Sequence, residues 1–360
     1  MSNDAGGPGR VDPAPPCAPQ GYPRPGYQQG YPPRPGVLEP GVIPLRPLGL
    51  SDIFNGAVNY IRRNPKATLG LTAIVVVAAQ LISLVLQILG PLIATGDLDP
   101  TLSEEATTAG DVVVLSGSSL ADSIVSALAS VVLSGMLTVI VGRAVFGADI
   151  TIGEAWQRVK GRLLALLGFT ALEAVAVVLL IVVVVVAIIA AEAIGGGVAA
   201  VLVGAPLVIA VFLLIVYVAT SLLFTPALIV LERLGIVEAA GRSFTLVKKD
   251  FWRVLGVWIL AALAAAVIAG AVGVPFSFGG QLLAGSGSDG WVLVGLILIA
   301  VGAAIGQILT APFSAGVIVL LYTDRRIRAE AFDLVLHTGA AAGPGVPADS
   351  TDHLWLTRRP

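Results

Sequence analysis

The sequence predicts an all-α integral membrane protein in which six transmembrane helices form three parallel repeats, each an interfacial amphipathic helix followed by a transmembrane hairpin. Three observations lead to this prediction: the length of the apolar runs, the alternation of basic residues between them, and a similarity among three connecting segments. Of the 360 residues, 56% are hydrophobic and only 12% are charged, which is too much apolar surface for a water-soluble globule. Lipid is therefore the expected solvent of most of the chain.

Six apolar runs are each long enough to cross a bilayer. A helix rises about 1.5 Å per residue, so about 20 residues cover a hydrocarbon core roughly 30 Å thick. All of the runs exceed that length, and they cover residues 67–94, 120–145, 163–191, 198–231, 254–278 and 291–321. An even number of crossings places both termini on the same side of the membrane.

Basic residues alternate between the segments that connect these runs. The 21 Lys and Arg residues lie before the first run, at or after the end of the second, after the fourth and after the sixth. The connections after the first, third and fifth runs hold none of them, and eight acids lie in or beside these connections. Because Lys and Arg of short loops stay in the cytoplasm, we expect a multi-pass protein of the cell (plasma) membrane with both termini cytoplasmic and residues 95–119 outside.

Two tails flank a predicted membrane domain that covers residues 48–337. Residues 1–47 hold 13 of the 23 prolines, a composition typical of a disordered segment with polyproline II character. This tail is either a docking or self-association segment for a protein partner or a solvated tether. Residues 338–360 are predicted to be a short polar cytoplasmic tail.

Three connecting segments resemble one another, which favours a repeated unit. Each begins with an acid, becomes basic, and leads into an odd-numbered run; they are residues 51–66, 153–162 and 237–253. Each unit enters and returns on the same side of the membrane, so the three are expected to be parallel copies about an axis along the membrane normal. The sequence therefore predicts a pseudo-threefold bundle.

The same segments have the spacing of amphipathic helices. In the first, Phe54, Val58 and Ile61 share one face. Acids precede bases by four residues, a spacing that stabilises a helix by a few tenths of a kcal/mol, in the pairs Glu154–Arg158 and Glu238–Arg242. Such helices are predicted to lie in the inner membrane interface with their bases toward anionic headgroups; the alternative is that they only extend the crossings.

Three polar residues are predicted to lie near the middle of the membrane. Glu173 is ten residues into its run, a depth of roughly 15 Å, and Gln80 and Gln307 lie at comparable depth. An acid within the membrane is a candidate proton or cation site. Alternatively, a protonated Glu173 joins helices by hydrogen bonds to Gln80 or Gln307, each worth about 1 kcal/mol.

A polar cluster directly after the sixth run is a candidate surface for anionic headgroups or a protein partner. It comprises Tyr322, Asp324, Arg325, Arg326, Arg328, Glu330 and Asp333, to which we add Glu238 and Arg242 from the third segment. The alternative is a solvated helix with pairs such as Glu330 with Arg326. With two His, one Cys and no catalytic motif, the sequence predicts no enzyme, no metal site and no cofactor, and a net charge of -2 gives no reason to expect nucleic-acid binding.

Three motifs together resemble a known family: Arg-Pro-Leu-Gly-Leu-Ser-Asp-Ile-Phe from Arg46, Thr-Pro-Ala-Leu-Ile-Val-Leu-Glu from Thr225, and Tyr-Thr-Asp-Arg-Arg-Ile-Arg-Ala-Glu-Ala-Phe-Asp-Leu from Tyr322. They are similar to the membrane domain associated with glycerophosphoryl diester phosphodiesterases, and most of all to its stand-alone actinobacterial relatives, the proline- and glycine-rich transmembrane proteins. The resemblance covers about residues 46–336, and Ala331 departs from the Gly usual in that family. It implies no phosphodiesterase activity, because in that family the activity resides in a separate (β/α) barrel.

These observations predict a non-enzymatic scaffold or accessory factor in envelope or lipid biology. Membrane lipids and a protein that binds the N-terminal tail are the expected partners, and no oligomeric state is predicted. A transporter is the alternative, with Glu173, Gln80 and Gln307 as its site along the pseudo-threefold axis. A membrane-embedded hydrolase would need a role for Asp324 or Asp333 that no motif indicates.

Overall fold

The structure, a computed structural model, describes residues 42, 44, 46–94, 109–148, 150–285, 288–332, 334–335 and 354–356. Within these ranges every regular element is a helix and there is no strand. The predicted N-terminal tail lies outside the described residues except for residues 42, 44, 46 and 47, and the predicted C-terminal tail except for residues 354–356. Asp333 also lies outside them.

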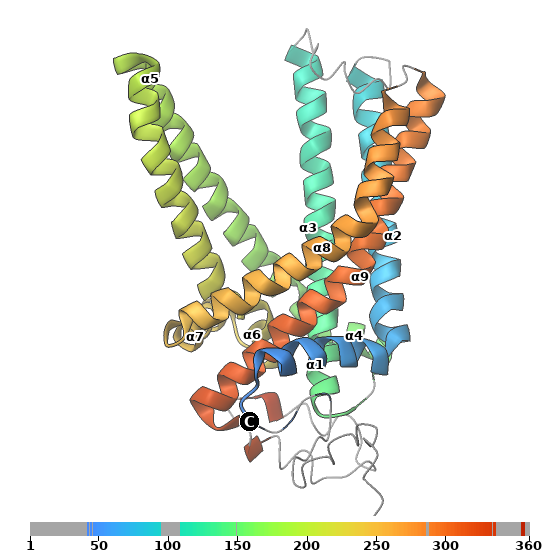
Figure 1. Cartoon of the computed structure of the whole chain (residues 1–360), viewed down its shortest axis with the longest axis vertical. Helices are drawn as coiled ribbons and strands as arrows, with labels where there is room; N and C mark the ends of the chain where they lie inside the picture. The colour runs from blue at the N-terminus through green and yellow to red at the C-terminus, as the bar shows by residue number, and fades with distance from the viewer. Residues whose placement is uncertain are drawn as a thin grey trace, which may run out of the picture. The chain divides into compact units, whose positions relative to one another are not determined.

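Short helices alternate with long helices along the chain (Figure 1). The elements in order are α1 (Leu50–Arg63), α2 (Pro65–Ala94), α3 (Ala109–Val145), α4 (Ile152–Val159), the 3-10 turn η2 (Lys160–Arg162), α5 (Leu163–Ser221), α6 (Thr225–Leu231), α7 (Ile236–Lys248), α8 (Phe251–Ala284) and α9 (Asp289–Glu330). Five helical stretches within the described residues are long and apolar enough to cross a membrane. Their length and composition indicate a multi-pass membrane protein.

The longest helix, α5, folds back on itself at one residue. Gly196 has φ 71° and ψ -171°, a conformation that glycine adopts far more readily than other residues. Figure 1 shows the resulting two arms of α5, and Gly204 on the second arm packs against Ile188 on the first, since a Cβ at Gly204 would lie 3.0 Å from Cγ1 of Ile188. The predicted third and fourth runs therefore form one hairpin without an intervening loop.

The fourth run does not extend to Leu231 as predicted. The second arm of α5 ends at Ser221, and α6 begins at Thr225 with Pro226 in its first turn. Proline has no N–H and suits the first turn of a helix, so a new helix starts there and the expected single crossing is broken. All the residues of α6 except Pro226 are buried, so this short helix belongs to the protein core.

Two other predicted boundaries also move. The helix α3 begins at Ala109, well before the expected Leu120, and α9 continues past the expected Leu321 to Glu330. It ends where Ala331 adopts a left-handed conformation with φ 52°, at the position where the resembling family has Gly. The extension of α9 carries the Arg-rich motif as helix.

The acids that begin the three similar segments have a shared local role. Asp52, Glu154 and Glu238 each occupy the third position of a short helix. The Asp52 carboxylate accepts the Gly49 N–H at 2.9 Å, and the Glu154 carboxylate accepts the Thr151 N–H at 2.9 Å. Acids at this position satisfy exposed N–H groups and favour the helix dipole. The repeated acid is therefore a signal that starts a helix.

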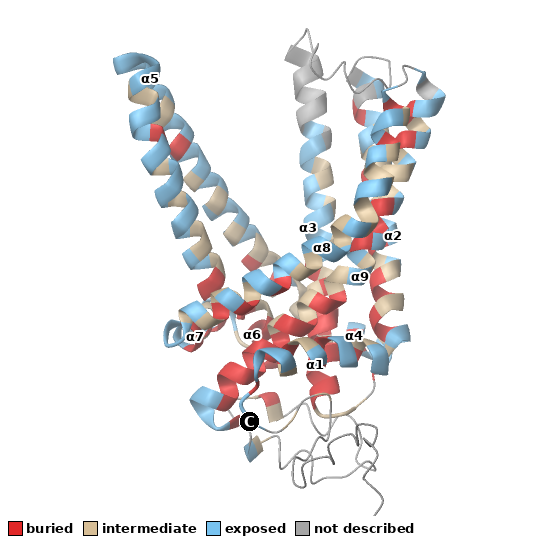
Figure 2. Ribbon diagram, viewed as in Figure 1, coloured by how far each residue is buried: buried red, intermediate tan, exposed pale blue. Residues whose placement is uncertain are grey.

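The protein core lies where the short helices meet the ends of the long ones (Figure 2). It is built mainly from α1, the second half of α3, α6, α7 and the last third of α9, and it also includes residues of α4 and of the first turns of α2, α5 and α8. In the most apolar stretch of α5, residues 174–191, Val184 is in contrast the single buried residue. The exposed apolar side chains of this stretch indicate that lipid, and not protein, surrounds much of this hairpin.

The helix α1 packs against α9 through side chains that lie one position before Phe54, Val58 and Ile61, the apolar face predicted to meet the inner membrane interface. Its buried side chains include Ile53, Ala57 and Tyr60, whereas Val58, from the expected face, is 37% exposed. The Tyr60 hydroxyl donates a hydrogen bond to the carbonyl oxygen of Pro312 in α9. Packing against α9 has therefore selected the face that holds small and hydrogen-bonding residues.

Close approach between helices depends on glycine at several positions. Between α8 and α9, a Cβ at Gly295 would lie 2.4 Å from the Gly280 carbonyl oxygen, and one at Gly302 would lie 2.4 Å from Cβ of Phe276. Between α1 and α9, a Cβ at Gly316 would lie 2.5 Å from Cε1 of Tyr60. These distances are too short for any side chain without movement of a helix.

Replacement of Gly316 by alanine is expected to destabilise the α1–α9 contact. The buried Tyr60 ring is held by its hydrogen bond to Pro312 and cannot move aside, so Gly316→Ala should lower the free energy of unfolding by about 1–3 kcal/mol. The measurement is thermal unfolding of the detergent-purified protein. Gly256→Ala in α8 is the matched control, because no atom lies within 4 Å of its added Cβ; equal stability of the two variants would contradict the prediction.

Candidate functional site: the ion network around α9

The Arg-rich end of α9 lies inside the core of the protein. Tyr322 and Asp324 are 0% exposed, and Arg325 and Arg326 are 1% and 4% exposed. Charged side chains are rarely this buried unless they are paired. Their partners come from the segment before α1, from α6 and α7, from the start of α8 and from Trp355.

Four charged residues form a closed ring of alternating sign, which we call the Glu232 ring. Arg242 Nε lies 2.7 Å from Glu232 Oε2, close enough for an ion pair although it is off the line of a hydrogen bond, and Arg242 Nη2 donates to Glu330 Oε1 at 2.7 Å. Arg326 Nε donates to Glu330 Oε2 at 3.1 Å, and Arg326 Nη1 lies 3.7 Å from Glu232 Oε1. The ring joins the end of α6, the middle of α7 and the end of α9.

Aromatic side chains surround the Arg326 corner of the ring. The Tyr322 hydroxyl donates a 2.5 Å hydrogen bond to Glu232, and the Arg326 guanidinium carbon lies 4.0 Å from the ring centroid of Phe332, a cation–π geometry. Trp355 stacks on Tyr322 at 6.1 Å, and its carbonyl oxygen accepts from Arg326 Nη1 at 3.2 Å. Trp355 was not among the predicted site residues. A large aromatic residue within a predicted polar tail is the sequence feature that could have indicated a buried contact there.

A second group of contacts, the Asp324 cluster, fixes the chain segment that precedes α1. The buried Asp324 carboxylate accepts the Leu48 N–H at 2.9 Å, Arg328 Nε at 2.9 Å and Arg253 Nη2 at 3.3 Å. The Leu48 carbonyl oxygen in turn accepts from Arg253 Nη2 at 2.8 Å and from Arg328 Nη2 at 3.0 Å. Both backbone polar groups of the buried Leu48 are thus satisfied by the end of α9 and the start of α8.

Arg325 connects α9 to the C-terminal end of α7. Its Nε and Nη2 both donate to the Leu246 carbonyl oxygen at 3.1 Å, and its Nη1 pairs with Asp250. Carbonyls in the last turn of a helix have no partner within the helix, and an arginine at this end also favours the helix dipole. Arg325 therefore caps α7 from a neighbouring helix. The Glu232 ring, the Asp324 cluster and this cap together form the ion network.

The electrostatic field of the network keeps its central arginine charged. Burial acts to lower the pKa of Arg242, but the Glu232 and Glu330 carboxylates outweigh it and raise the pKa above its ordinary value. The guanidinium therefore stays protonated at every accessible pH. Removal of one partner from this partly buried network leaves the opposite charge uncompensated, which lowers the free energy of unfolding.

Most of the predicted headgroup-binding or partner-binding residues are thus engaged within the chain. Arg242 does not pair with Glu238 as expected from spacing, since its partners are Glu232 and Glu330 and Glu238 is exposed. The Glu330–Arg326 pair does form, but it does not lie on a solvated helix face, because the Arg326 side chain is only 5% exposed. Asp333 lies outside the described residues.

The predicted midplane residues are not brought together. Glu173 lines an apolar cavity of about 290 Å³ between the two arms of α5, and none of its lining residues belongs to α2 or α9. Gln80 is half-buried on α2, and Gln307 is exposed on α9. Among the described residues no hydrogen bond joins Glu173, Gln80 and Gln307, so they do not form one site.

Loss of the Glu232 charge is expected to weaken the network. Glu232→Gln leaves Arg242 and Arg326 with one carboxylate between them, so the free energy of unfolding should fall by roughly 3 kcal/mol. Thermal unfolding in detergent measures the change. The matched control is Glu238→Gln, the same chemical change at an exposed position, which should stay within about 0.5 kcal/mol of the wild type. The two variants unfolding alike would show that the ring does not stabilise the protein.

Comparison with known protein families identifies a domain whose two ends lie in the ion network. A family model described as a domain of unknown function, DUF7847, matches residues 48–325. The match begins at Leu48 and ends at Arg325, so the Asp324 cluster joins its two ends. No curated protein and no solved structure matches the chain. The matched residues cover more than three quarters of the 360-residue chain, and the chain therefore belongs to the DUF7847 family.

Proposed function

We propose that this protein is a six-span, non-enzymatic membrane scaffold or accessory factor of the plasma membrane, with both termini in the cytoplasm. The observation that carries the proposal is the ion network. Its charged groups face one another and join the segment at Leu48, the helices α6 and α7, the start of α8 and the end of α9. A site that handles a polar substrate presents such groups to a cleft, whereas here they hold helices in a fixed arrangement.

Six crossings follow if each arm of α5 spans the membrane. Both arms exceed the roughly 20 residues required, and α2, α3, α8 and α9 supply four more. Each pair of crossings then follows a short helix that has an acid at its third position, namely α1, α4 and α7. This order supports three parallel repeats, and the alternating bases support a cytoplasmic position for the ion network.

Exposed aromatic residues support an interfacial position for the short helices. Trp156 in α4 is 41% exposed and Trp252, at the start of α8, is 81% exposed. Tryptophan is enriched where a membrane meets water, because its ring is apolar and its N–H is polar. The neighbouring bases favour an anionic inner leaflet.

A role in envelope or lipid biology is supported by the resemblance to the membrane domain associated with glycerophosphoryl diester phosphodiesterases. In this proposal the chain acts as such a membrane domain, and its Pro-rich N-terminal tail recruits a protein partner. The transporter alternative has less support, because Glu173, Gln80 and Gln307 do not converge on one cavity.

Sidedness can be measured with single reporter cysteines in a Cys17→Ser background, since Cys17 is the one cysteine of the chain. With six crossings, a membrane-impermeant maleimide should label Glu104→Cys and Glu192→Cys in intact cells. Lys248→Cys should react only after permeabilisation. Labelling of Lys248→Cys from outside, or protection of Glu104→Cys, would contradict the proposed topology.

The scaffold role predicts a protein partner that depends on the N-terminal tail. Crosslinking in native membranes followed by mass spectrometry should recover a defined protein from the full chain. That protein should be lost when residues 1–41 are replaced by a Gly/Ser segment of equal length, an exchange that keeps Leu48 and its contacts with Asp324. Recovery of the same proteins from both chains, or of lipid alone, would contradict the tail-dependent scaffold.

A further inference from the structure

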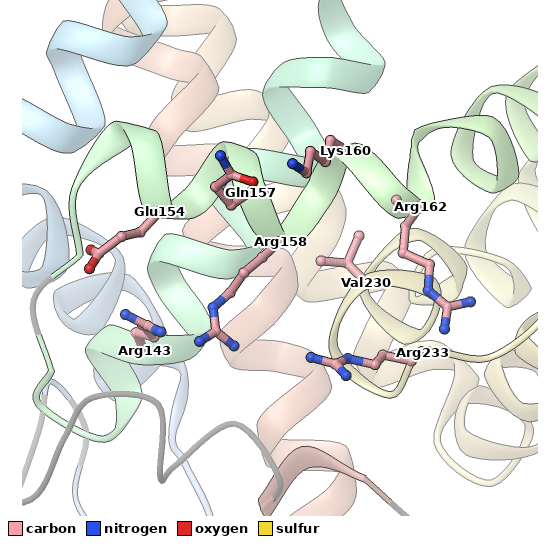
Figure 3. A pocket seen from close by; sticks show the side chains of 9 residues that line it. Arg143, Glu154, Gln157, Arg158, Lys160, Arg162, Val230 and Arg233 are labelled. Atoms are coloured by element: carbon pink, nitrogen blue, oxygen red, sulfur yellow. The ribbon is translucent and has the colours of Figure 1, made fainter.

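A basic cavity of about 560 Å³ lies outside the ion network, beside α4 and η2 (Figure 3). It is formed by the end of α3, by α4 and η2, by the end of α6, and by Arg233 two residues after α6. Five of its lining residues are basic and one, Glu154, is acidic; the bases are Arg143, Arg158, Lys160, Arg162 and Arg233. From the sequence, these bases indicate topology, and those of the second segment also indicate an interfacial helix with its bases toward anionic headgroups; their meeting in one cavity was not predicted.

The bases are arranged by depth. Arg143 is 3% exposed, Arg158 and Arg162 are half-buried, and Lys160 and Arg233 are exposed. Figure 3 shows the guanidinium groups of Arg143, Arg158 and Arg233 directed toward the same space. Three separate stretches of chain thus bring positive charge to one cavity, with an inner base and an outer rim.

The positive charge of the cavity exceeds what its own residues compensate. Glu154 is the one carboxylate among the lining residues, and it accepts hydrogen bonds from the Thr151 N–H and hydroxyl. Within the described part of the chain, the side chains of Lys160, Arg162 and Arg233 make no hydrogen bond or ion pair. Like charges held close together repel one another, and an anion in the cavity would offset that repulsion.

The backbone at Arg233 is also unusual. Its φ is 57°, in the left-handed region that a residue with a side chain rarely adopts. A conformation of this kind is unfavourable and persists where surrounding structure holds it, commonly at functional sites. Here it follows directly after Glu232, whose carboxylate is fixed in the Glu232 ring. The ion network therefore determines where Arg233 stands at the rim of the cavity.

We infer that this cavity binds the phosphate group of an anionic phospholipid of the inner leaflet. Arginine forks match phosphate oxygens with paired hydrogen bonds, and a lysine adds a point charge. A lipid source is favoured because the cavity adjoins apolar surface: η2 leads directly into α5, Leu164 is 84% exposed, and Trp156 on α4 is 41% exposed. Acyl chains can lie along this surface while the headgroup occupies the cavity. The inference goes beyond the proposed scaffold role. It rests on one part of the proposed function, the position of α4 and η2 at the inner membrane interface.

The test uses the full chain, purified in a neutral detergent so that no charged bilayer surface attracts the bases. Binding of phosphatidylglycerol and of phosphatidylcholine with the same acyl chains is measured by native mass spectrometry. Wild-type protein should bind phosphatidylglycerol at least about tenfold more tightly than phosphatidylcholine, and the variant Lys160→Gln/Arg162→Gln/Arg233→Gln should lose at least about tenfold in phosphatidylglycerol affinity.

The matched control is Arg62→Gln/Lys248→Gln/Lys249→Gln, which removes the same charge from exposed positions outside the cavity. It should keep its phosphatidylglycerol affinity within about twofold of the wild type. Equal affinity of the cavity variant and the control would overturn the inference. So would equal binding of the two lipids by the wild type.

Two further measurements use the wild-type protein and so do not depend on the folding of the cavity variant. Glycerol 1-phosphate should not bind detectably at lipid-saturating concentrations; binding as tight as that of phosphatidylglycerol would assign the cavity to a soluble phosphate and overturn the lipid source. A phosphatidylglycerol with a photoreactive headgroup should label wild-type peptides that contain residues 158–162 or Arg233, and labelling elsewhere alone would overturn the site. Neither result depends on the protein partner of the tail, so failure here is distinguishable from failure of the scaffold proposal.

Discussion

The arrangement of the helices depends on one buried carboxylate. Asp324 accepts hydrogen bonds from the Leu48 N–H and from two arginines, and through them it fixes where the family unit begins relative to where it ends. A buried charge of this kind is costly unless every partner is in place. Its position therefore constrains α1, which follows Leu48, and α8, which begins beside Arg253. The Glu232 ring extends the same constraint to α6 and α7.

This distribution of interactions separates the protein into two physical regimes. Where the short helices meet, buried ion pairs and apolar side chains form a core like that of a soluble protein. Along the α5 arms, apolar side chains remain exposed and packing relies on small residues and on the surrounding lipid. Rigidity is thus concentrated at one end of the helices. The proposed lipid cavity lies at that end, beside the ring that positions Arg233.

The sequence predicted the helical class, the long apolar runs and the helical nature of the three similar segments, because hydrophobic length and periodicity are local properties. It did not predict the break after Ser221 or the extension of α9 to Glu330, where tertiary contacts decide the boundary. Spacing suggested that Arg242 pairs with Glu238, but the fold brings Glu232 and Glu330 closer. Arg242 and Glu330 are 88 positions apart, and a pair so distant in the sequence cannot be predicted from local spacing. The contact of Trp355 with Arg326 could not be predicted from spacing either. Three consecutive glycines, residues 195–197, mark the place of the bend in α5, but the sequence does not show that Gly196 adopts the positive φ.

The contact between Leu48 and Asp324 joins residues 276 positions apart. A ribosome that inserts this chain into a membrane releases the first partner long before the second exists. Until then Arg253, which is also synthesised before Asp324, lacks its carboxylate partner. The link between the two ends of the family unit therefore forms only after nearly the whole unit has been synthesised, and a chain terminated before Asp324 lacks it.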